Sequence, residues 1–391
     1  MIGKNLIYVC NFAANYSGNF IASISKLAEN VMKNNQVFFL FPEGARNKKW
    51  LSKLPVPNSH LLFCTFGSEE LNVICQKLSK DFSTKNTVVH THFVDGEILS
   101  SVTSNFKNVV VHYHMTVPEV FGPRSFFQKV KLNLIYKKVV VVGVSKAVTL
   151  DLKKYFPFCK HECITNAISF EDLEHNVKLF NPSISIDQDS FSILIHGTDF
   201  YGKGVDLAIK ALDNIDPNMS SKCMLYITSH HTESAHKLVS TLKSSFANVR
   251  VLDVTEGVKK LYDSVDLFIS PSRKEAFGYS VAEASYSECQ VLASDVPGQN
   301  TMMDIPGIYW VDLKDSESLK KAIAEAFIKK ETNKIGEIKE EQKEYVFKNY
   351  NIDKWVDANI KLYDTYFERT ERTNKPMFYI TSLKKMLGLL K

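Results

Sequence analysis

The sequence predicts an α/β protein made of two doubly wound domains, each with a parallel sheet covered by helices. Short β-rich runs alternate with helical patterns from end to end, and a polar stretch, Asn181–Ser190, separates them into two series. Such alternation requires crossover helices between parallel strands, and 391 residues suffice for two or three domains. We expect an N-terminal Rossmann-like domain at 1–175, a C-terminal one at 190–350, and a helical segment at 351–391 that packs back on the N-terminal domain.

The composition indicates a folded globular protein and excludes several other classes. Hydrophobic residues make up 45% of the chain and charged residues 23%, which supplies a large core and excludes global disorder. The net charge of +5 is too small for a protein that coats nucleic acid, although it leaves room for a local basic patch, and no nucleic-acid partner is expected. No apolar run approaches the roughly 18 residues of a membrane span, and Met1–Asn11 is interpreted as a first strand and not as a signal peptide. Seven cysteines without a Cys-x-x-Cys pair indicate a reducing compartment, so we expect a cytoplasmic protein.

In the N-terminal series, six apolar runs are expected to form buried strands: Leu6–Cys10, Val37–Leu40, Val88–Thr91, Val109–His112, Val139–Val144 and Cys163–Thr165. A helix is expected between the first two strands, because apolar residues recur there at helical spacing: Phe20, Ile21, Ile24, Leu27, Ala28, Val31 and Met32.

In the C-terminal series, the expected strands are Phe191–His196, Met224–Ile227, Val249–Leu252, Leu267–Ile269, Val291–Ala293 and Ile308–Val311. Helical spacing of apolar residues predicts helices over Val205–Leu212 and Leu319–Phe327, and Lys339–Arg372 is expected to form a long charged helical ending. Ligands of doubly wound sheets bind beyond the carboxyl ends of the strands, so functional residues are expected in the segments that follow strands.

The segment Ile269–Ala284 runs from a strand through a loop into a helix that is expected to start near Ser280. Glu275 lies in the loop, and Glu283 follows it by eight residues, in the first helical turn. The N–H groups of a helix N-terminus and of the backbone around Phe277 can hold a diphosphate, and carboxylates can accept hydrogen bonds from ribose and sugar hydroxyls. A structural alternative is a capping box, because Ser280-x-x-Glu283 has the required spacing.

This segment resembles the E-x7-E element of the retaining GT-B glycosyltransferases of the glycosyltransferase 4 family, also called glycosyl transferases group 1. The resemblance implies the GT-B fold, in which two Rossmann-like domains face each other across a cleft. It implies a catalytic role for Glu275 at the donor sugar and a ribose-binding role for Glu283. It also implies that the donor's diphosphate binds to the residues between the two glutamates: Ala276, Phe277, Gly278 and Tyr279.

The segment His196–Asp206 resembles the family's G-R-x(n)-K-G segment, in which an arginine and a lysine neutralise the leaving diphosphate. Lys203 matches the lysine and Gly197 the first glycine, but Thr198 stands where the arginine belongs. The structural alternative for Lys203 is a solvated side chain in a turn. A nearby cation is expected to replace the arginine: Arg273 or Lys274.

Two histidine-bearing runs end strands in the N-terminal half: Val88–Phe93 and Val110–His114. By resemblance, His114 occupies the family's catalytic position near the donor sugar, and Gly18 lies in the loop that faces the acceptor and the diphosphate. His90 and His112 are interpreted as core residues whose rings are satisfied by backbone hydrogen bonds. The His-x-His spacing also suggests a metal, but no carboxylate or cysteine cluster accompanies it in the sequence, so no metal site is expected.

A basic segment, 124–138, interleaves lysines with Phe126 and Phe127, and no acidic residue lies between Glu119 and Asp151. It resembles the interfacial helix by which some family members reach lipid-linked acceptors. The C-terminal residues 382–391 form a second candidate membrane anchor. The alternative is that the first segment packs on its own domain and the second is a docked or frayed tail.

Together these features predict a retaining, metal-independent glycosyltransferase. The expected donor is a nucleotide sugar, most simply a UDP-sugar, from which a hexose or N-acetylhexosamine moves to a surface glycan acceptor: a polysaccharide repeat unit, a lipid-linked glycan or a protein-linked glycan. The donor is a substrate, and no cofactor is expected. One alternative is a catalytically silent GT-B partner subunit that binds glycan or stabilises an active homologue, which the threonine at 198 favours. Another is a sugar-nucleotide epimerase that uses no acceptor. The expected location is the cytoplasm. If the basic segment binds lipid, the protein lies at the inner face of the cell membrane.

Overall fold

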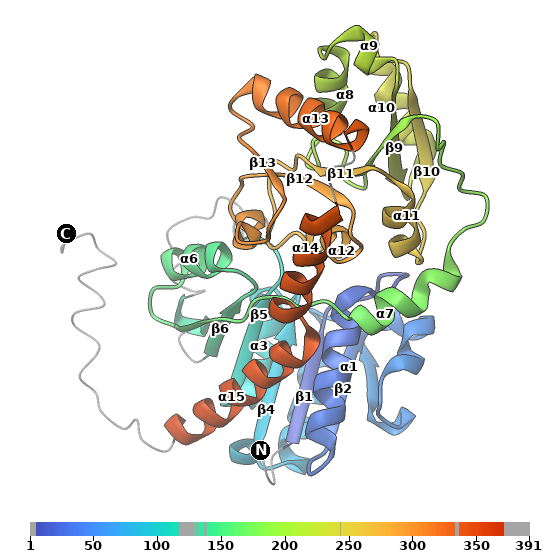
Figure 1. The fold of residues 1–391 in the computed structure, drawn as a ribbon. Helices are drawn as coiled ribbons and strands as arrows, with labels where there is room; N and C mark the ends of the chain where they lie inside the picture. Colours follow the sequence, from blue (N-terminus) through green and yellow to red (C-terminus); the bar gives the residue numbers. More distant parts are fainter. Residues whose placement is uncertain are drawn as a thin grey trace, which may run out of the picture. The chain divides into compact units, whose positions relative to one another are not determined.

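The structure is a computed structural model that describes residues 5–116, 130, 133–136, 139–242, 244–332 and 336–370. The chain divides into two compact units. Unit 1 combines the segment up to Ala167 with the segment from Ile352 onward, and unit 2 is Ile168–Asn351. Each unit has one parallel sheet with helices between its strands (Figure 1).

The sheet of unit 1 has seven parallel strands in the order β3-β2-β1-β4-β5-β6-β7. These strands are β1 (Asn5–Cys10), β2 (Val37–Pro42), β3 (Leu61–Cys64), β4 (Thr87–His92), β5 (Val109–Tyr113), β6 (Val139–Gly143) and β7 (Lys160–Cys163). The helices of unit 1 include α1 (Gly18–Met32), α2 (Glu69–Asp81), α3 (Gly96–Asn105), α6 (Lys146–Tyr155) and α15 (Ile352–Thr370). The strand order reverses between β1 and β4, which makes this the switch point of a doubly wound sheet.

The core of unit 1 lies between its sheet and the helices α1 and α15. Figure 1 shows α15, coloured red, beside the blue α1, and the two helices are in contact. Parallel pairing brings Tyr8 beside His90, and His92 beside both Cys10 and His112. These side chains share one buried face with the valines that precede them, so polar rings replace aliphatic side chains where the central strands end.

The sheet of unit 2 has six parallel strands in the order β10-β9-β8-β11-β12-β13, with its switch point between β8 and β11. These strands are β8 (Phe191–His196), β9 (Cys223–Ser229), β10 (Val249–Asp253), β11 (Leu267–Ser270), β12 (Gln290–Ser294) and β13 (Tyr309–Val311). The helices of unit 2 include α7 (Phe170–His175), α8 (Val205–Asp213), α9 (Pro217–Ser220), α10 (Thr232–Thr241), α11 (Val258–Ser264), α12 (Tyr279–Tyr286), α13 (Ser316–Glu331) and α14 (Gly336–Asn349). Aliphatic residues of β8, β11 and β12 pack with α8 and α13 in its core.

Most of the expected strands form, and three expectations need correction. A strand that the sequence did not predict, β3, pairs with β2. The strand expected at Cys163–Thr165 is β7, which ends at Cys163 and is an edge strand with exposed residues. The expected helix Lys339–Arg372 is two helices within the described residues, α14 and α15. They are separate because the chain at Tyr350 and Asn351 pairs with Ile168 instead of continuing the helix.

The membrane-related expectations fall mostly outside the described residues. Only residues 130 and 133–136 of the basic segment are described, and none of 382–391. Among the helices that the structure describes, none combines the length and the apolar character needed to span a bilayer.

Candidate functional site

The switch point of unit 2 brings two predicted residues to one edge of the sheet. Leu267 of β11 pairs with Ile193 of β8, so the carboxyl ends of these strands are neighbours. Lys203 lies in the loop that follows β8, and Glu275 lies in the loop that follows β11. This is the edge at which doubly wound sheets bind ligands.

Lys203 and Glu275 form an ion pair. Lys203 Nζ lies 2.5 Å from Glu275 Oε1, and the side chains are 34% and 12% exposed. Ser272, whose side chain is buried, donates a hydrogen bond to the same oxygen at 3.0 Å. Lys203 is therefore not a solvated side chain in a turn: it is held by a carboxylate 72 residues away in the sequence.

Two glycines let the loops of this edge pack closely. The backbone N–H of Arg273 donates to the carbonyl of Gly202 at 2.8 Å, which joins the loop after β8 to the loop after β11. Gly204 has a positive φ of +73°, and a Cβ there would lie 2.1 Å from the carbonyl oxygen of Pro271. Gly298 has a φ of +94°, and its Cβ would lie 2.1 Å from the carbonyl oxygen of Glu275. Larger residues do not fit at either position without a shift of the backbone.

Arg273 does not fill the place of the missing arginine. Its guanidinium donates two hydrogen bonds of 2.7 Å to the carboxylate of Asp206, in the first turn of α8. This bidentate pair commits Arg273 to bracing the loops. The expectation that Arg273 balances the phosphate charge opposite Thr198 is therefore wrong for this structure. Lys274, the other candidate, is exposed.

Glu283 is held by a chain of hydrogen bonds that starts at a strand. His196, the last residue of β8, bonds through Nδ1 to Thr228 Oγ1 at 2.7 Å and through Nε2 to the hydroxyl of Tyr262 at 2.8 Å. Tyr262, on α11, donates in turn to Glu283 Oε2 at 3.5 Å. Burial, with a smaller contribution from the charge of Lys203, lowers the pKa of His196 to about 4, so its ring is neutral at pH 7.

The segment between the two glutamates offers backbone groups. α12 begins at Tyr279, directly after Gly278, whose φ is +95°. Ser280 lies inside the helix and no side chain caps it, so the capping-box interpretation of Glu283 is wrong. The helix therefore begins with N–H groups that have no acceptor within it. The side chain of Phe277 is buried and that of Ala276 is half-buried. These two residues would therefore contact a ligand through their backbone groups.

The two remaining predicted residues of the loop after β8 differ in exposure. Gly197 is buried, and a Cβ there would lie 2.6 Å from Ile227 Cγ2, so the strand end requires glycine. Thr198 is exposed. Both lie at the carboxyl end of β8, on the edge that carries Lys203.

An Asp-x-Asp sequence, the usual carboxylate pair for a metal-bound diphosphate, lies elsewhere in unit 2. Asp187 and Asp189 precede β8, at the amino end of that strand, whereas Lys203 follows its carboxyl end. The side chain of Asp187 accepts a hydrogen bond from the N–H of Asp189, as in a local turn. This pair is therefore separated from the candidate site by the length of the strand.

His114 and Gly18 belong to unit 1. Gly18 opens α1 with a φ of +55°. His114 follows β5, and its Nε2 lies 2.9 Å from Nδ1 of His92. Its ring stacks on Phe93 at 4.5 Å between centroids. Burial lowers the pKa of His114 to about 3, so a catalytic role for this ring would be that of a neutral hydrogen-bonding group.

His90 and His112 are core residues, as expected, but their partners are not backbone groups. Both side chains are buried, and each is at most 1% exposed. His90 Nδ1 bonds to the hydroxyl of Tyr363 on α15, and His112 Nδ1 lies 3.3 Å from His90 Nε2.

Three contributors to the site were not predicted from the sequence. His196 stands at a strand end beside Gly197, which could have drawn attention to it. Tyr262 and Ser272 carry no local signal, because their contacts with the glutamates depend on how the elements pack.

Residues 177–342 match the model of the family described as Glycosyl transferases group 1. This segment contains Lys203, Glu275 and Glu283, and its resemblance to glycosyl transferases group 1 is confirmed. An uncharacterized glycosyltransferase of Methanocaldococcus jannaschii is 28% identical over 195 residues, which are 47% of this chain and 50% of that protein. The lipopolysaccharide core biosynthesis mannosyltransferase LpcC of Rhizobium leguminosarum is 30% identical over 129 residues, 31% of this chain and 36% of that protein. The matches thus span half or less of these relatives.

Solved structures confirm the fold over nearly the whole chain. The match to a glycosyltransferase from Rickettsia africae covers 93% of this chain and 98% of that protein, with a TM-score of 0.72 and 15% sequence identity. HepE from Anabaena was solved in complex with UDP and glucose. The match to it covers 93% of this chain and the full length of HepE, with a TM-score of 0.66 and 13% identity. The predicted class, two parallel-sheet Rossmann-like domains of the GT-B type, is therefore confirmed as a fold.

Proposed function

We propose that this protein is a retaining glycosyltransferase that transfers a hexose or N-acetylhexosamine from a nucleotide sugar to a glycan acceptor. The ion pair between Lys203 and Glu275 carries the proposal, because it places a cation and a carboxylate together at the switch point of unit 2. Glu283, held by Tyr262, supplies a second carboxylate on the helix that begins at this edge. The family match over residues 177–342 covers all three residues.

Lys203 is the residue that stabilises the leaving group. Cleavage of the sugar–phosphate bond leaves negative charge on the departing diphosphate, and preorganised positive charge at that point lowers the barrier. An ammonium group has three N–H donors, and Glu275 accepts from one of them. The others are suited to the phosphate oxygens, so Lys203 can bridge the diphosphate and Glu275.

Glu275 and Glu283 bind hydroxyl groups in this proposal. Glu275 accepts from Lys203 and Ser272 through Oε1, and its other oxygen is suited to a hydroxyl of the donor sugar. Glu283 accepts from the ribose hydroxyls while Tyr262 fixes one of its oxygens. The diphosphate binds to main-chain N–H groups from Ala276 to Tyr279 at the start of α12.

We propose a UDP-sugar as donor and no metal ion at the donor site. HepE, a structural neighbour, was solved with UDP and glucose. The position of Asp187 and Asp189 at the amino end of β8 supports a diphosphate that is neutralised by Lys203 and by main-chain N–H groups. Two curated relatives act in lipopolysaccharide core and O-antigen biosynthesis, which supports a surface glycan as the acceptor.

A second candidate function is that of a catalytically silent GT-B subunit that binds glycan or stabilises an active homologue. Thr198 and the pairing of Arg273 with Asp206 favour it, because both reduce the positive charge available to a leaving diphosphate. The intact pair of Lys203 and Glu275 opposes it.

Product analysis tests the proposed activity. The full chain is incubated with UDP-, GDP- and ADP-sugars, with and without a lipid-linked glycan acceptor, and the products are followed by NMR. We expect nucleoside diphosphate release from one donor class, faster with acceptor, and a product that keeps the anomeric configuration of the donor. An inverted product would contradict retention, an isomerised nucleotide sugar would identify an epimerase, and no turnover with any donor would favour the silent subunit.

A further inference from the structure

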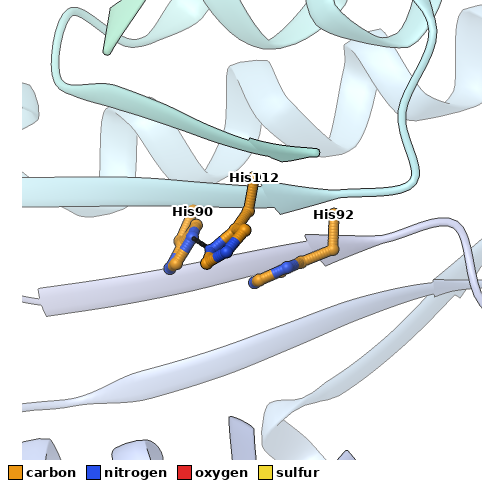
Figure 2. Close-up of side chains that lie close together, drawn as sticks. All are labelled: His90, His92 and His112. Atoms are coloured by element: carbon orange, nitrogen blue, oxygen red, sulfur yellow. Dashed lines mark hydrogen bonds between the residues drawn. The ribbon is translucent and has the colours of Figure 1, made fainter. Parts of the chain in front are cut away.

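Three histidine rings meet inside unit 1. His90 and His92 lie two residues apart on β4, and His112 lies beside His92 on β5. Their ligand atoms are all within 4.8 Å of one another, and all three side chains are buried. Figure 2 shows the rings gathered on one side of the two strands, with His92 directed toward the other two.

The outward nitrogens of two rings are already held. His90 Nδ1 lies 2.5 Å from the hydroxyl of Tyr363, and His92 Nδ1 lies 2.9 Å from Nε2 of His114. When an imidazole is fixed through Nδ1, its Nε2 is oriented as a ligand, and metal-binding histidines are typically held in this way. The Nε2 atoms of His90 and His92 are thus both oriented by partners outside the cluster.

The remaining nitrogens of the three rings are poorly satisfied by hydrogen bonds. In the described part of the chain, His92 Nε2 and His112 Nε2 are buried without a hydrogen-bond partner. His90 Nε2 and His112 Nδ1 are 3.3 Å apart, which is long for a hydrogen bond. A tetrahedral zinc ion with Zn–N distances of about 2.0–2.1 Å would separate two nitrogen ligands by about 3.3–3.4 Å. That separation therefore suits a shared metal ion better than a shared proton.

We propose that His90, His92 and His112 form a binding site for a divalent transition metal of the zinc class. Three neutral imidazoles are a known zinc ligand set, and imidazole is a ligand that zinc, copper and nickel accept in preference to magnesium or calcium. Tyr363 and His114 act as the outer partners that orient the ligands. The site is structural: it joins β4 to β5 and, through Tyr363, to α15. It does not depend on the proposed transferase activity.

The charge of the site limits its affinity. The cluster contains no carboxylate or thiol ligand within the described residues, and a buried dication without an anionic partner has a large desolvation cost. We therefore expect a dissociation constant for zinc in the micromolar range, weaker than that of cysteine-rich sites.

Metal content and ligand type test this proposal directly. Untagged full chain is treated with chelator and dialysed against zinc, either as folded protein or during refolding from denaturant, and the bound metal is measured by mass spectrometry. We expect one zinc per chain with micromolar affinity, and X-ray absorption that shows a shell of imidazole nitrogens. Cobalt(II) in place of zinc is expected to give the visible absorption of a tetrahedral site.

A matched pair of variants locates the metal. The double variant His92→Asn/His112→Asn is expected to lose zinc affinity at least tenfold, whereas His236→Asn, which changes an exposed histidine on α10, is expected to keep it. Substoichiometric zinc after both loading routes would overturn the proposal, as would unchanged affinity in a folded double variant. If the double variant does not fold, the wild-type X-ray absorption decides: a shell dominated by oxygen ligands would refute the site.

Discussion

At the residue scale, Lys203 and Glu275 combine two properties that a sugar-nucleotide site needs. Their ion pair is short and partly shielded from solvent, and Ser272 donates a hydrogen bond to the same oxygen of Glu275 that Lys203 contacts. Each side chain is thereby oriented before any ligand binds. This preorganisation is what makes an electrostatic contribution to catalysis large.

Substitution of either member of this pair should abolish most of the activity without unfolding the protein. We expect Lys203→Ala and Glu275→Gln to lower turnover by about 10²–10³-fold, the usual effect of removing one electrostatic stabiliser. Stability should fall by no more than about 1 kcal/mol, because the pair remains partly exposed. Lys237→Ala and Glu233→Gln, both on exposed positions of α10, serve as controls. Near-normal turnover of either site variant in a folded protein would refute the assignment.

His196 should make the stability of unit 2 depend on pH. Its pKa is about 4 in the folded protein, because burial disfavours the charged ring, and about 6.5 in an unfolded chain. The unfolded chain therefore binds one more proton than the folded protein between these two values. The stabilisation is complete above pH 6.5 and is lost, at up to about 1.4 kcal/mol per pH unit, as the pH falls toward 4.

Denaturant unfolding across this pH range measures the effect. The variant His196→Asn, compared with His236→Asn, should show a shallower loss of unfolding free energy below pH 6.5 by about one proton. Parallel pH profiles for the wild type and His196→Asn would show that the pKa of His196 is the same in the folded and unfolded states, which would contradict a ring whose pKa is lowered by burial.

At the element scale, the loops after β8, β11 and β12 pack closely at the site, because Gly204 and Gly298 leave room for the backbone of the loop after β11. Gly298→Ala should lower stability by more than strain in φ alone would cause, because the added Cβ meets the carbonyl of Glu275 at 2.1 Å. The matched control is Gly67→Ala. Gly67 also has a positive φ, of +78°, but its nearest neighbour would be a flexible glutamate side chain at 3.8 Å. The control should lose about 1–2 kcal/mol.

Thermal unfolding and turnover of the two variants distinguish the effect of backbone strain at a positive φ from that of the close contact with the carbonyl of Glu275. Gly298→Ala should be less stable than Gly67→Ala and should also lose activity, because the shift of backbone reaches Glu275. Equal losses of stability in the two variants, with activity retained in both, would mean that the close approach at Gly298 is unimportant.

The elements show what the sequence could and could not predict. Val139–Gly143 is a fully buried strand inside the sheet, and its unbroken apolar run predicts it well. β7 was displaced because its sequence, Lys160–Cys163, is polar and lies at a sheet edge, where burial imposes no pattern. The expected start of α12 near Ser280 is confirmed to within one residue, but the capping box is not, because the helix begins after Gly278, whose φ is positive, and no side chain caps it.

The residues of the candidate site could be proposed from the sequence, but their contacts could not. Lys203, Glu275 and Glu283 each lie in a local segment that resembles a family motif, and that resemblance singles them out. The pairing of Lys203 with Glu275 spans 72 residues, and that of His196 with Tyr262 spans 66. Such contacts follow from the strand order, which places β8 beside β11, and no local pattern encodes that order.

At the scale of the whole molecule, the fluorescence of three tryptophans can be used to follow the unfolding of each unit. Trp50 and Trp355 belong to unit 1, and Trp310 belongs to unit 2. The proposed nucleotide site lies in unit 2 and the proposed zinc site in unit 1. A ligand that binds only the native state raises the stability of the unit that holds it, so each ligand should stabilise a different fluorescence transition.

Single-unit fluorescence tests this separation. In Trp310→Phe the remaining signal reports unit 1, and in Trp50→Phe/Trp355→Phe it reports unit 2. UDP should raise the unfolding midpoint more in the second variant, and zinc should raise it more in the first. The reverse order for either ligand would place its site in the other unit.

Calorimetric titration of UDP into the full chain tests whether Glu283, Lys203 and the start of α12 form a nucleotide site. We predict saturable binding at one site, weakened at least tenfold in both Glu283→Gln and Lys203→Ala and unchanged in Glu233→Gln. Absence of binding by UDP, GDP and ADP alike, or equal affinity in the wild type and both site variants, would show that these residues do not form a nucleotide site.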